Sequence, residues 1–167
     1  HAVDPGISLI LEKARTVPKV VSQNPGSETI LALNPDLAII QENGHQELIK
    51  TLRDAGIKVY VCKVPTNLEM IRQRIINFSI LVGEPAAGKK MLAELDRKIK
   101  YVATVVNKIP EDKKKTVLAY SMLGAFGSQE GLFHDICVKA GVKNGAALAG
   151  LVRNQHLSKE KIIAVDP

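Results

Sequence analysis

Two patterns of apolar residues alternate along most of the chain. The first is a short apolar run with the length and the β-branched content of a buried strand, found at residues 19–22, 37–40, 57–62 and 116–120. The second is an amphipathic helical spacing, found at residues 45–55 and 131–140. Strands that alternate with helices at this spacing predict an α/β fold with parallel sheets and crossover helices.

The middle of the chain has a different pattern, because helical spacing continues without a strand. Thr66-Asn67-Leu68-Glu69 has the form of a capping box, in which Thr66 would begin a helix that stops at Gly83. A second helix would begin near Pro85 and would end before Pro110, since proline cannot continue a helix. This helical stretch is longer than an ordinary crossover connection.

The pattern therefore predicts three parts. We expect residues 1–65 to form part of a first lobe with a parallel sheet, and residues 66–110 to form a stiff helical connection between lobes. Residues 111–167 would then form part of a second lobe, with a turn at Asn144-Gly145.

Cap residues indicate two short helices, one near each end of the chain. Asn24 would cap the first, with Pro25 at its first helical position, and Asn34-Pro35 would stop it. Ser158 would cap the second, which runs to Val165.

These two helices carry similar sequences. Glu28-Thr29-Ile30-Leu31-Ala32-Leu33-Asn34-Pro35 and Glu160-Lys161-Ile162-Ile163-Ala164-Val165-Asp166-Pro167 share Glu, Ile, Ala and Pro at equivalent positions. Each segment places an acidic side chain where the helix dipole favours it, and each ends in Asx-Pro, which stops a helix and can lead into a strand. The second copy stops where its strand should begin, so we expect the chain to be a fragment.

Composition and charge narrow the classes of function. The 167 residues are 46% hydrophobic and contain no apolar run long enough to cross a membrane. A net charge of +6 raises the question of nucleic acid, but the lysines are dispersed and the chain has no tryptophan for stacking on bases. Residues 1–6 lack the basic and apolar regions of a signal peptide, so any export signal is expected to have been removed.

An ordered series of segments resembles a known family. Val17-Pro18-Lys19-Val20 and the run from Asn34 to Leu37 are similar to the first lobe of binding proteins for siderophores, haem and cobalamin. Residues 66–83 resemble the helix that enters the connection between lobes in those proteins. Lys115-Thr116-Val117-Leu118 and Ala140-Gly141-Val142-Lys143-Asn144 resemble the second lobe.

The resemblance implies a function in import. Members of this class, class III of the substrate-binding proteins of ABC importers, have two Rossmann-like lobes joined by a long helix and bind ligand between the lobes. The resemblance implies an iron-siderophore, haem or cobalamin as ligand, no catalysis, no cofactor, and an extracytoplasmic location in the periplasm or as a lipoprotein. One glutamate on each lobe of the family pairs with permease arginines, and Glu28 and Glu160 occupy those positions. A chain that holds only part of each lobe is also expected to self-associate through unpaired strand edges.

Ligands of open α/β sheets bind beyond the carboxyl ends of strands. Here these ends are followed by residues 41–45 and by a glycine-rich loop at 121–128. The candidates for apolar contact and for hydrogen bonding to a bulky ligand are Gln41, His45, Tyr120, Ser121, Met122 and Phe126.

Three alternatives remain open at this point. Residues 83–90 nearly fit the phosphate-binding loop GxxxxGK[ST], and Ile162–Asp166 resembles the strand that ends in a magnesium-binding acid, but Lys90 replaces the hydroxyl residue. His134 and Cys137 have a spacing that can share a metal, although a buried Cys beside a surface His explains the same pattern. An α/β interaction domain without a role in transport is the third alternative.

Overall fold

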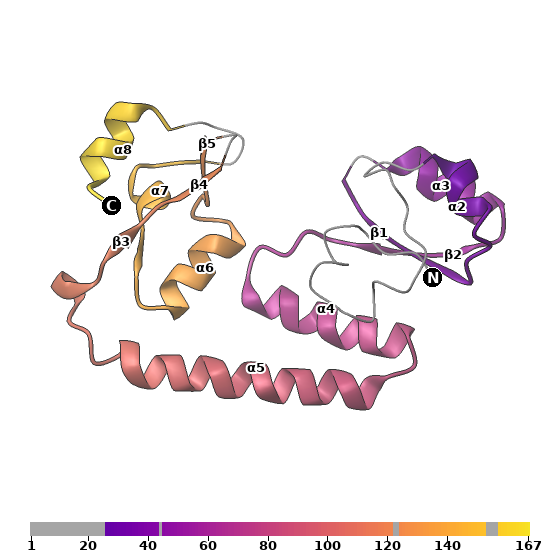
Figure 1. Ribbon diagram of the computed structural model, residues 1–167, viewed down its shortest axis with the longest axis horizontal. Coiled ribbons are helices and arrows are strands. Elements are labelled where there is room, and N and C mark those ends of the chain that lie inside the picture. The colour runs from indigo at the N-terminus through magenta and orange to yellow at the C-terminus, as the bar shows by residue number, and fades with distance from the viewer. Residues whose placement is uncertain (1–25, 44, 122–123, 153–156) are drawn as a thin grey trace. The chain divides into compact units, whose positions relative to one another are not determined.

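The computed structural model describes residues 26–43, 45–121, 124–152 and 157–167, and Figure 1 traces the elements in order. Helices and parallel strands alternate, which confirms the expected α/β class. Contacts within the chain divide it into two compact units, residues 1–64 and 65–167, and each unit is described by itself.

The first unit is built around a parallel strand pair. Strand β1 (Leu37–Gln41) pairs with β2 (Lys58–Cys62) in a register that sets Leu37 opposite Lys58. Helix α3 (Gln46–Asp54) is the crossover between them, and its apolar face buries Ile49 and Leu52, the latter completely. The amphipathic spacing read from the sequence is therefore the face that covers the sheet.

Helix α2 (Ser27–Leu31) begins later than the sequence suggested. Its N-cap is Gly26, whereas the expected cap Asn24, the expected first residue Pro25 and the strand at residues 19–22 lie outside the described residues. The helix ends at Leu31, and Asn34 then adopts a left-handed conformation with φ of 42°. Asparagine tolerates this conformation better than most residues, which explains its place before Pro35.

The second unit begins with two packed helices, α4 (Leu68–Leu81) and α5 (Pro85–Val106), which run side by side in Figure 1. The cap of α4 is Asn67, whose Oδ1 accepts a hydrogen bond from the Met70 N–H at 2.9 Å. The expectation of a Thr66 cap was wrong by one residue, since the Thr66 hydroxyl lies 3.4 Å from the Met70 sulfur instead. Gly83, with φ of 74°, makes the turn between the helices as expected.

Two features hold α4 against α5. Gly88 is buried, and a Cβ at this position would overlap the Cβ and Oγ of Ser79 on α4. The Arg72 guanidinium on α4 also forms a bidentate ion pair with Asp96 on α5. The hydrogen bond from Arg72 to Asp96 raises the pKa of Arg72 above its ordinary value. A glycine contact sets the distance between the helices, and an exposed ion pair links their surfaces.

The rest of the second unit is a small α/β arrangement on this helical pair. Strand β3 (Thr116–Val117), which follows the 3-10 helix η2 (Glu111–Lys113), pairs in parallel with β6 (Lys143–Asn144) through the crossover helix α6 (Leu132–Lys139). Helices α7 (Gly145–Leu148) and α8 (Lys159–Val165) follow, with the expected cap Ser158 accepting from the Lys161 N–H at 3.3 Å.

Two expectations for this region were wrong. The glycine-rich segment is an antiparallel hairpin of β4 (Ala119–Ser121) and β5 (Gly124–Phe126), so the expected strand at 116–120 is interrupted where the chain changes partner from β6 to β5. Asn144-Gly145 is a strand end and helix start, in which Gly145 packs closely against Val117. Asn-Gly favours a turn, but it also suits a helix start, where Asn caps the helix and Gly allows another part of the backbone to approach closely.

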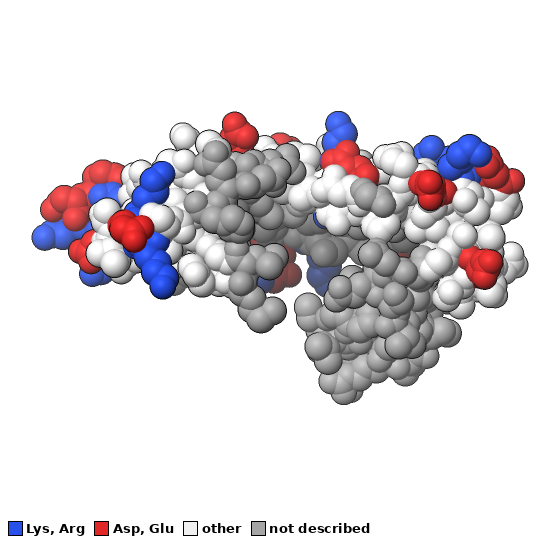
Figure 2. All heavy atoms as spheres, turned by 90° about the horizontal axis from the view of Figure 1, so that it is seen from above, with Lys and Arg blue, Asp and Glu red and all other residues white. Residues whose placement is uncertain are grey.

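Acidic and basic side chains are interspersed on the face shown in Figure 2. Several form exposed ion pairs, including Lys50 with Asp54 and Lys98 with Glu94. Among the described residues, no helix is both long and apolar enough to cross a membrane.

We expect Gly88→Ala to destabilise the protein. Alanine in place of glycine favours an exposed helix interior by about 1 kcal/mol, but overlap in a packed contact costs about 1–3 kcal/mol. Chemical denaturation should therefore show a lower free energy of unfolding for Gly88→Ala, and the change should become neutral or stabilising in a Ser79→Gly background. A stabilising effect of Gly88→Ala in the wild-type background would contradict the close contact.

Candidate functional site

Glu28 and Glu160 occupy the same local structure in different units. Each is the second residue of a short helix, and the N-caps have nearly the same backbone angles, with φ of −62° and ψ of 156° at Gly26 and φ of −70° and ψ of 159° at Ser158. Both carboxylates are exposed. The sequence repeat is therefore a repeated structure.

The backbone hydrogen bonds of the two segments match as well. Ile30 N–H donates to Gly26 O at 3.4 Å, and its equivalent Ile162 N–H donates to Ser158 O at 3.1 Å. At the other end, the amide of Asn34 donates to the Leu31 carbonyl at 2.9 Å, and the amide of Asp166 donates to the Ile163 carbonyl at 3.1 Å. Asn34 and Asp166 are left-handed, with φ of 42° and 46°. In both segments a left-handed Asx residue thus precedes the proline, although α2 ends at Leu31 and α8 continues to Val165.

The electrostatic settings of the two glutamates differ in one respect. The Ser158 hydroxyl and the Glu160 backbone N–H donate hydrogen bonds to the Glu160 carboxylate and hold its pKa below the ordinary value. The equivalent of Ser158 in the first segment is Gly26, which has no side chain to donate. The Glu160 carboxylate is therefore stabilised by its own cap residue, and the first segment has no equivalent side-chain donor at Gly26.

In the first unit, Gln41 and His45 lie at the end of the sheet where ligands bind in open α/β folds. Gln41 is the last residue of β1 and is exposed. His45 is half-buried and precedes α3 as its N-cap, although its side chain makes no capping hydrogen bond. Their location agrees with the sequence argument, and their contact with a ligand stays a prediction.

In the second unit, the hairpin carries the other candidates. Tyr120 pairs with Ala125, and Phe126 is next to Ala125 in sequence, so Tyr120 and Phe126 face opposite sides of the hairpin. Tyr120 is 67% exposed, whereas Phe126 packs against Phe133 of α6 with ring centroids 5.9 Å apart. The two aromatic candidates therefore do not form one surface.

Of the remaining two candidates, Ser121 is the last residue of β4. Ser121 is exposed, and its hydroxyl donates to the Gly124 carbonyl at 3.3 Å across the hairpin. Met122 lies outside the described residues.

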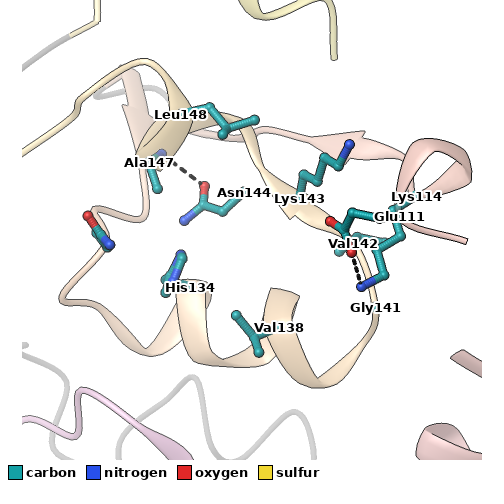
Figure 3. Close-up of a pocket in the computed structure, with 11 residues that line it drawn as sticks. Glu111, Lys114, His134, Val138, Gly141, Val142, Lys143, Asn144, Ala147 and Leu148 are labelled. Carbon is teal, nitrogen blue, oxygen red and sulfur yellow. Dashed lines mark hydrogen bonds and ion pairs between the residues drawn. The ribbon is translucent and has the colours of Figure 1, made fainter. Parts of the chain in front are cut away.

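A cavity of about 500 Å³ lies between α6 and the β6–α7 segment of the second unit (Figure 3). Its wall combines apolar side chains such as Val138 and Leu148 with polar ones such as Gln129, His134 and Lys143. Near one end of it, Lys114 pairs with Glu111 at 2.6 Å, a hydrogen bond that lowers the pKa of Glu111. The described ligand candidates are not among its lining residues.

The structure does not bring His134 and Cys137 together as a metal site with a third ligand. No group of three His, Cys, Asp or Glu side chains within residues 26–43, 45–121, 124–152 and 157–167 is placed to hold a metal ion. Cys137 is only 2% exposed, and burial raises the pKa of its thiol, so it stays protonated at neutral pH. His134 lines the cavity, and its Nδ1 atom is buried without a hydrogen-bond partner in the described part of the chain.

The nucleotide-binding alternative is wrong. Residues from Pro85 onward form the first turn of α5, so the segment cannot wrap backbone donors around a phosphate. Gly88 is buried against Ser79, and Ile162–Asp166 belongs to helix α8 and its cap instead of a strand. The sequence pattern matched by spacing alone, without the strand–loop–helix context that the motif requires.

Sequence reasoning missed the residues that fix the hairpin in place. Asn144 is buried, and its side-chain amide donates to the Gly127 carbonyl at 2.6 Å. Phe133 packs on Phe126 and leaves no room for a side chain at Gly127. These contacts depend on the fold of distant segments, so only the Asn-Gly dipeptide drew notice, and it favoured a turn.

Comparison with known proteins settles the family. A family model described as periplasmic binding protein matches residues 4–167. The chain belongs to the periplasmic binding protein family. The resemblance inferred from the ordered segments is confirmed.

Several members of known structure or name are similar to this chain. The cobalamin-binding protein of Halobacterium salinarum is 26% identical over 144 residues, which cover 84% of this chain and 38% of that protein. The apo form of the periplasmic heme-binding protein RhuT from Roseiflexus sp. RS-1 is 26% identical with a TM-score of 0.85, over 99% of this chain and 65% of RhuT.

A periplasmic heme binding protein from Pseudomonas aeruginosa shares the fold. Its TM-score is 0.81 at 21% identity, over 99% of this chain and 61% of that one. The chain spans less than two thirds of the length of each of these periplasmic binding proteins.

We expect Ser158→Ala to raise the pKa of Glu160 toward its ordinary value, because the largest stabilising hydrogen bond to the carboxylate is lost. A depressed pKa keeps Glu160 charged to lower pH, so its contribution to stability is present above the unfolded pKa and is lost as pH falls through the folded pKa. NMR titration of the side-chain carboxyl carbons measures the shift. Glu111, whose pKa is lowered by Lys114, is the internal control and should not change. An unchanged Glu160 titration would contradict the role of Ser158.

Proposed function

We propose that this protein is the substrate-binding component of an ABC importer. It captures a chelated metal or a tetrapyrrole, namely an iron-siderophore, haem or cobalamin, outside the cytoplasm and delivers it to a permease. The observation that carries this proposal is the family match over residues 4–167. Relatives named for cobalamin and heme support the ligand class.

The proposed function also assigns the chain to two lobes and a connection between them. Residues 1–65 are part of one lobe, 66–110 are the helical connection, and 111–167 are part of the other. The paired helices α4 and α5 support the stiffness of the connection, since the buried Gly88 contact and the Arg72–Asp96 ion pair resist sliding. We therefore propose small movements of the lobes on ligand binding.

Glu28 and Glu160 are the proposed contacts with the permease. Each carboxylate is exposed on a helix start whose backbone is fixed by the same hydrogen bonds, so it is preorganised for bidentate pairing with arginine. Two such contacts, one on each unit, would fix both the position and the orientation of the docked protein.

Gln41, His45, Tyr120, Ser121, Met122 and Phe126 remain the proposed ligand contacts. Of the described hairpin residues, Tyr120 is the strongest candidate, because its ring is largely exposed while that of Phe126 already packs on Phe133. The proposed cycle consists of capture, docking and release, and no covalent bond is made or broken in it.

A ligand screen tests the proposal. The full-length protein should bind haemin, cyanocobalamin or a ferric siderophore with one-to-one stoichiometry and a dissociation constant on the order of 1 μM or below. Absorbance titration detects haemin and cobalamin, and quenching of tyrosine fluorescence detects the others. Failure to bind any of the three classes would contradict the proposed ligand class.

The same titrations test the role of Tyr120. Tyr120→Ala should weaken binding of the identified ligand about tenfold or more, as expected for a contacting aromatic side chain. Tyr101→Ala is the matched control, since Tyr101 on α5 is 68% exposed, close to the 67% of Tyr120, and is not a proposed contact.

Charge reversal tests docking. Glu28→Lys together with Glu160→Lys should lower the affinity for the permease at least about tenfold, because two exposed carboxylates that pair with arginine would become repulsive. The binding of detergent-solubilised permease to the immobilised protein measures the effect. Glu47→Lys is the control, because Glu47 is also an exposed acid in the first turn of a helix, α3. Equal permease affinity in the double variant and the Glu47 control would refute the docking role.

A further inference from the structure

Asn144 is a buried polar residue with two separate sets of hydrogen bonds. It is 4% exposed, and it is the only polar or charged residue that is fully buried within the described part of the chain. Its Oδ1 accepts hydrogen bonds from the amides of Ala146 and Ala147 at 3.1 and 3.4 Å, which caps helix α7. Figure 3 shows the second of these bonds from the Asn144 side chain toward Ala147.

The other end of the Asn144 side chain reaches a different segment. Its Nδ2 donates to the Gly127 carbonyl at 2.6 Å, and Gly127 is the residue directly after strand β5. Helix capping uses only the oxygen, so it does not explain the amide donor. An aspartate or a serine would cap α7 equally well, but neither offers the same bond to Gly127.

The Gly127 position is also fixed from the side of α6. Gly127 has φ of 98°, and a Cβ there would overlap the ring of Phe133. That ring packs on Phe126, the last residue of β5, with an interplanar angle of 57°. Helix α6 is itself fixed, since the Leu68 amide at the start of α4 donates to Asp135 at 2.7 Å.

Besides this anchor, the described part of the hairpin is held by Ala125, which is buried in the core, and by the packing of Phe126 on Phe133. Its two strands have three residues each, and a short two-stranded hairpin is marginally stable by itself. Tyr120 and Ser121, which point to opposite faces of β4, are both exposed. The entry of the hairpin follows β3, which pairs with β6, and the Asn144–Gly127 hydrogen bond fixes its exit to the same strand.

We propose that Asn144 is a positioning residue, which holds the β4–β5 hairpin in its ligand-binding orientation through the Gly127 carbonyl. The ligand-binding part of this inference rests on the proposed function. Asn144 acts through Gly127, and Tyr120 and Ser121 are the side chains that it places.

The test separates the two roles of Asn144. Asn144→Asp keeps an oxygen that caps α7 and loses the donor to Gly127. Asn144→Ser keeps a capping hydroxyl without adding charge, and its shorter side chain does not reach Gly127. Loss of one hydrogen bond of ordinary strength corresponds to about a three- to tenfold change in an equilibrium. Both variants should therefore show about three- to tenfold faster hydrogen exchange at the amides of residues 119–121 and 124–127.

A second asparagine cap provides the matched control. Asn67 caps α4 through its Oδ1, with the Met70 amide at 2.9 Å, and has no contact with the hairpin among the described hydrogen bonds. Asn67→Asp and Asn67→Ser should leave exchange in the hairpin unchanged. Equal exchange rates in the wild type and both Asn144 variants, or the same acceleration in the Asn67 variants, would overturn the proposal.

Ligand binding is measured separately with haemin and cyanocobalamin on the full-length protein. If one of them binds the wild type, both Asn144 variants should bind it about three- to tenfold more weakly. Unchanged affinity in a variant with a loosened hairpin would refute the role in binding. If neither haemin nor cyanocobalamin binds the wild type, the measurement is made with a ferric siderophore. Failure of all three contradicts the proposed ligand class, and the exchange experiment still decides whether Asn144 holds the hairpin. Should one variant fail to fold, as judged by circular dichroism, the other gives the answer.

Discussion

The close contact between α4 and α5 at Gly88 is the interaction on which the second unit is built. Because glycine has no side chain, the backbone of α5 can approach Ser79 of α4, and the two helices form one platform. Helix α6 packs on this platform through the Leu68–Asp135 hydrogen bond, and Gly141 at its end lies against Val106 of α5. Strand β6 follows α6 directly and carries Asn144. The positions of Asn144 and of the hairpin that it contacts therefore depend on the packing of α4 and α5, which are distant in sequence.

The repeated helices rest on a simpler principle. A helix start has backbone amides without partners, and a carboxylate nearby is favoured by them. Both helices are short, and a left-handed Asx residue follows before the proline in each segment, with Asp166 as the C-cap of α8. The result is a small, rigid and exposed acidic feature that is made almost entirely from local interactions.

The locality of interactions decides what could be predicted from the sequence. The parallel pair of β1 and β2, the crossover α3 and the long helices were predicted, because their apolar spacing is regular over many residues. The helix starts at Glu28 and Glu160 were predicted in kind, although α2 begins at Ser27 and α4 is capped by Asn67 instead of Thr66. Errors of one or two residues at helix ends are expected when neighbouring residues are all good caps.

The β4–β5 hairpin was not predictable in the same way. Strands of three residues are too short for an alternating pattern, and glycine obscures it further. Tyr120 and Phe126 are both exposed but lie on opposite faces of the hairpin, and this depends on the register with the opposite strand and on the packing of Phe126 against Phe133 of α6. The use of Asn144 as a buried link was hidden because Asn-Gly suits both a turn and a helix cap.

The residues that hold the hairpin are separate from its exposed residues, and this affects which sequence changes the protein tolerates. The side chains that face outward belong to the hairpin, whereas the amide, the glycine and the ring that fix its exit lie beyond its last strand residue. Substitution of outward residues therefore leaves the packed interior intact. A scaffold of this kind lets a few solvent-facing positions vary without a compensating change in its core.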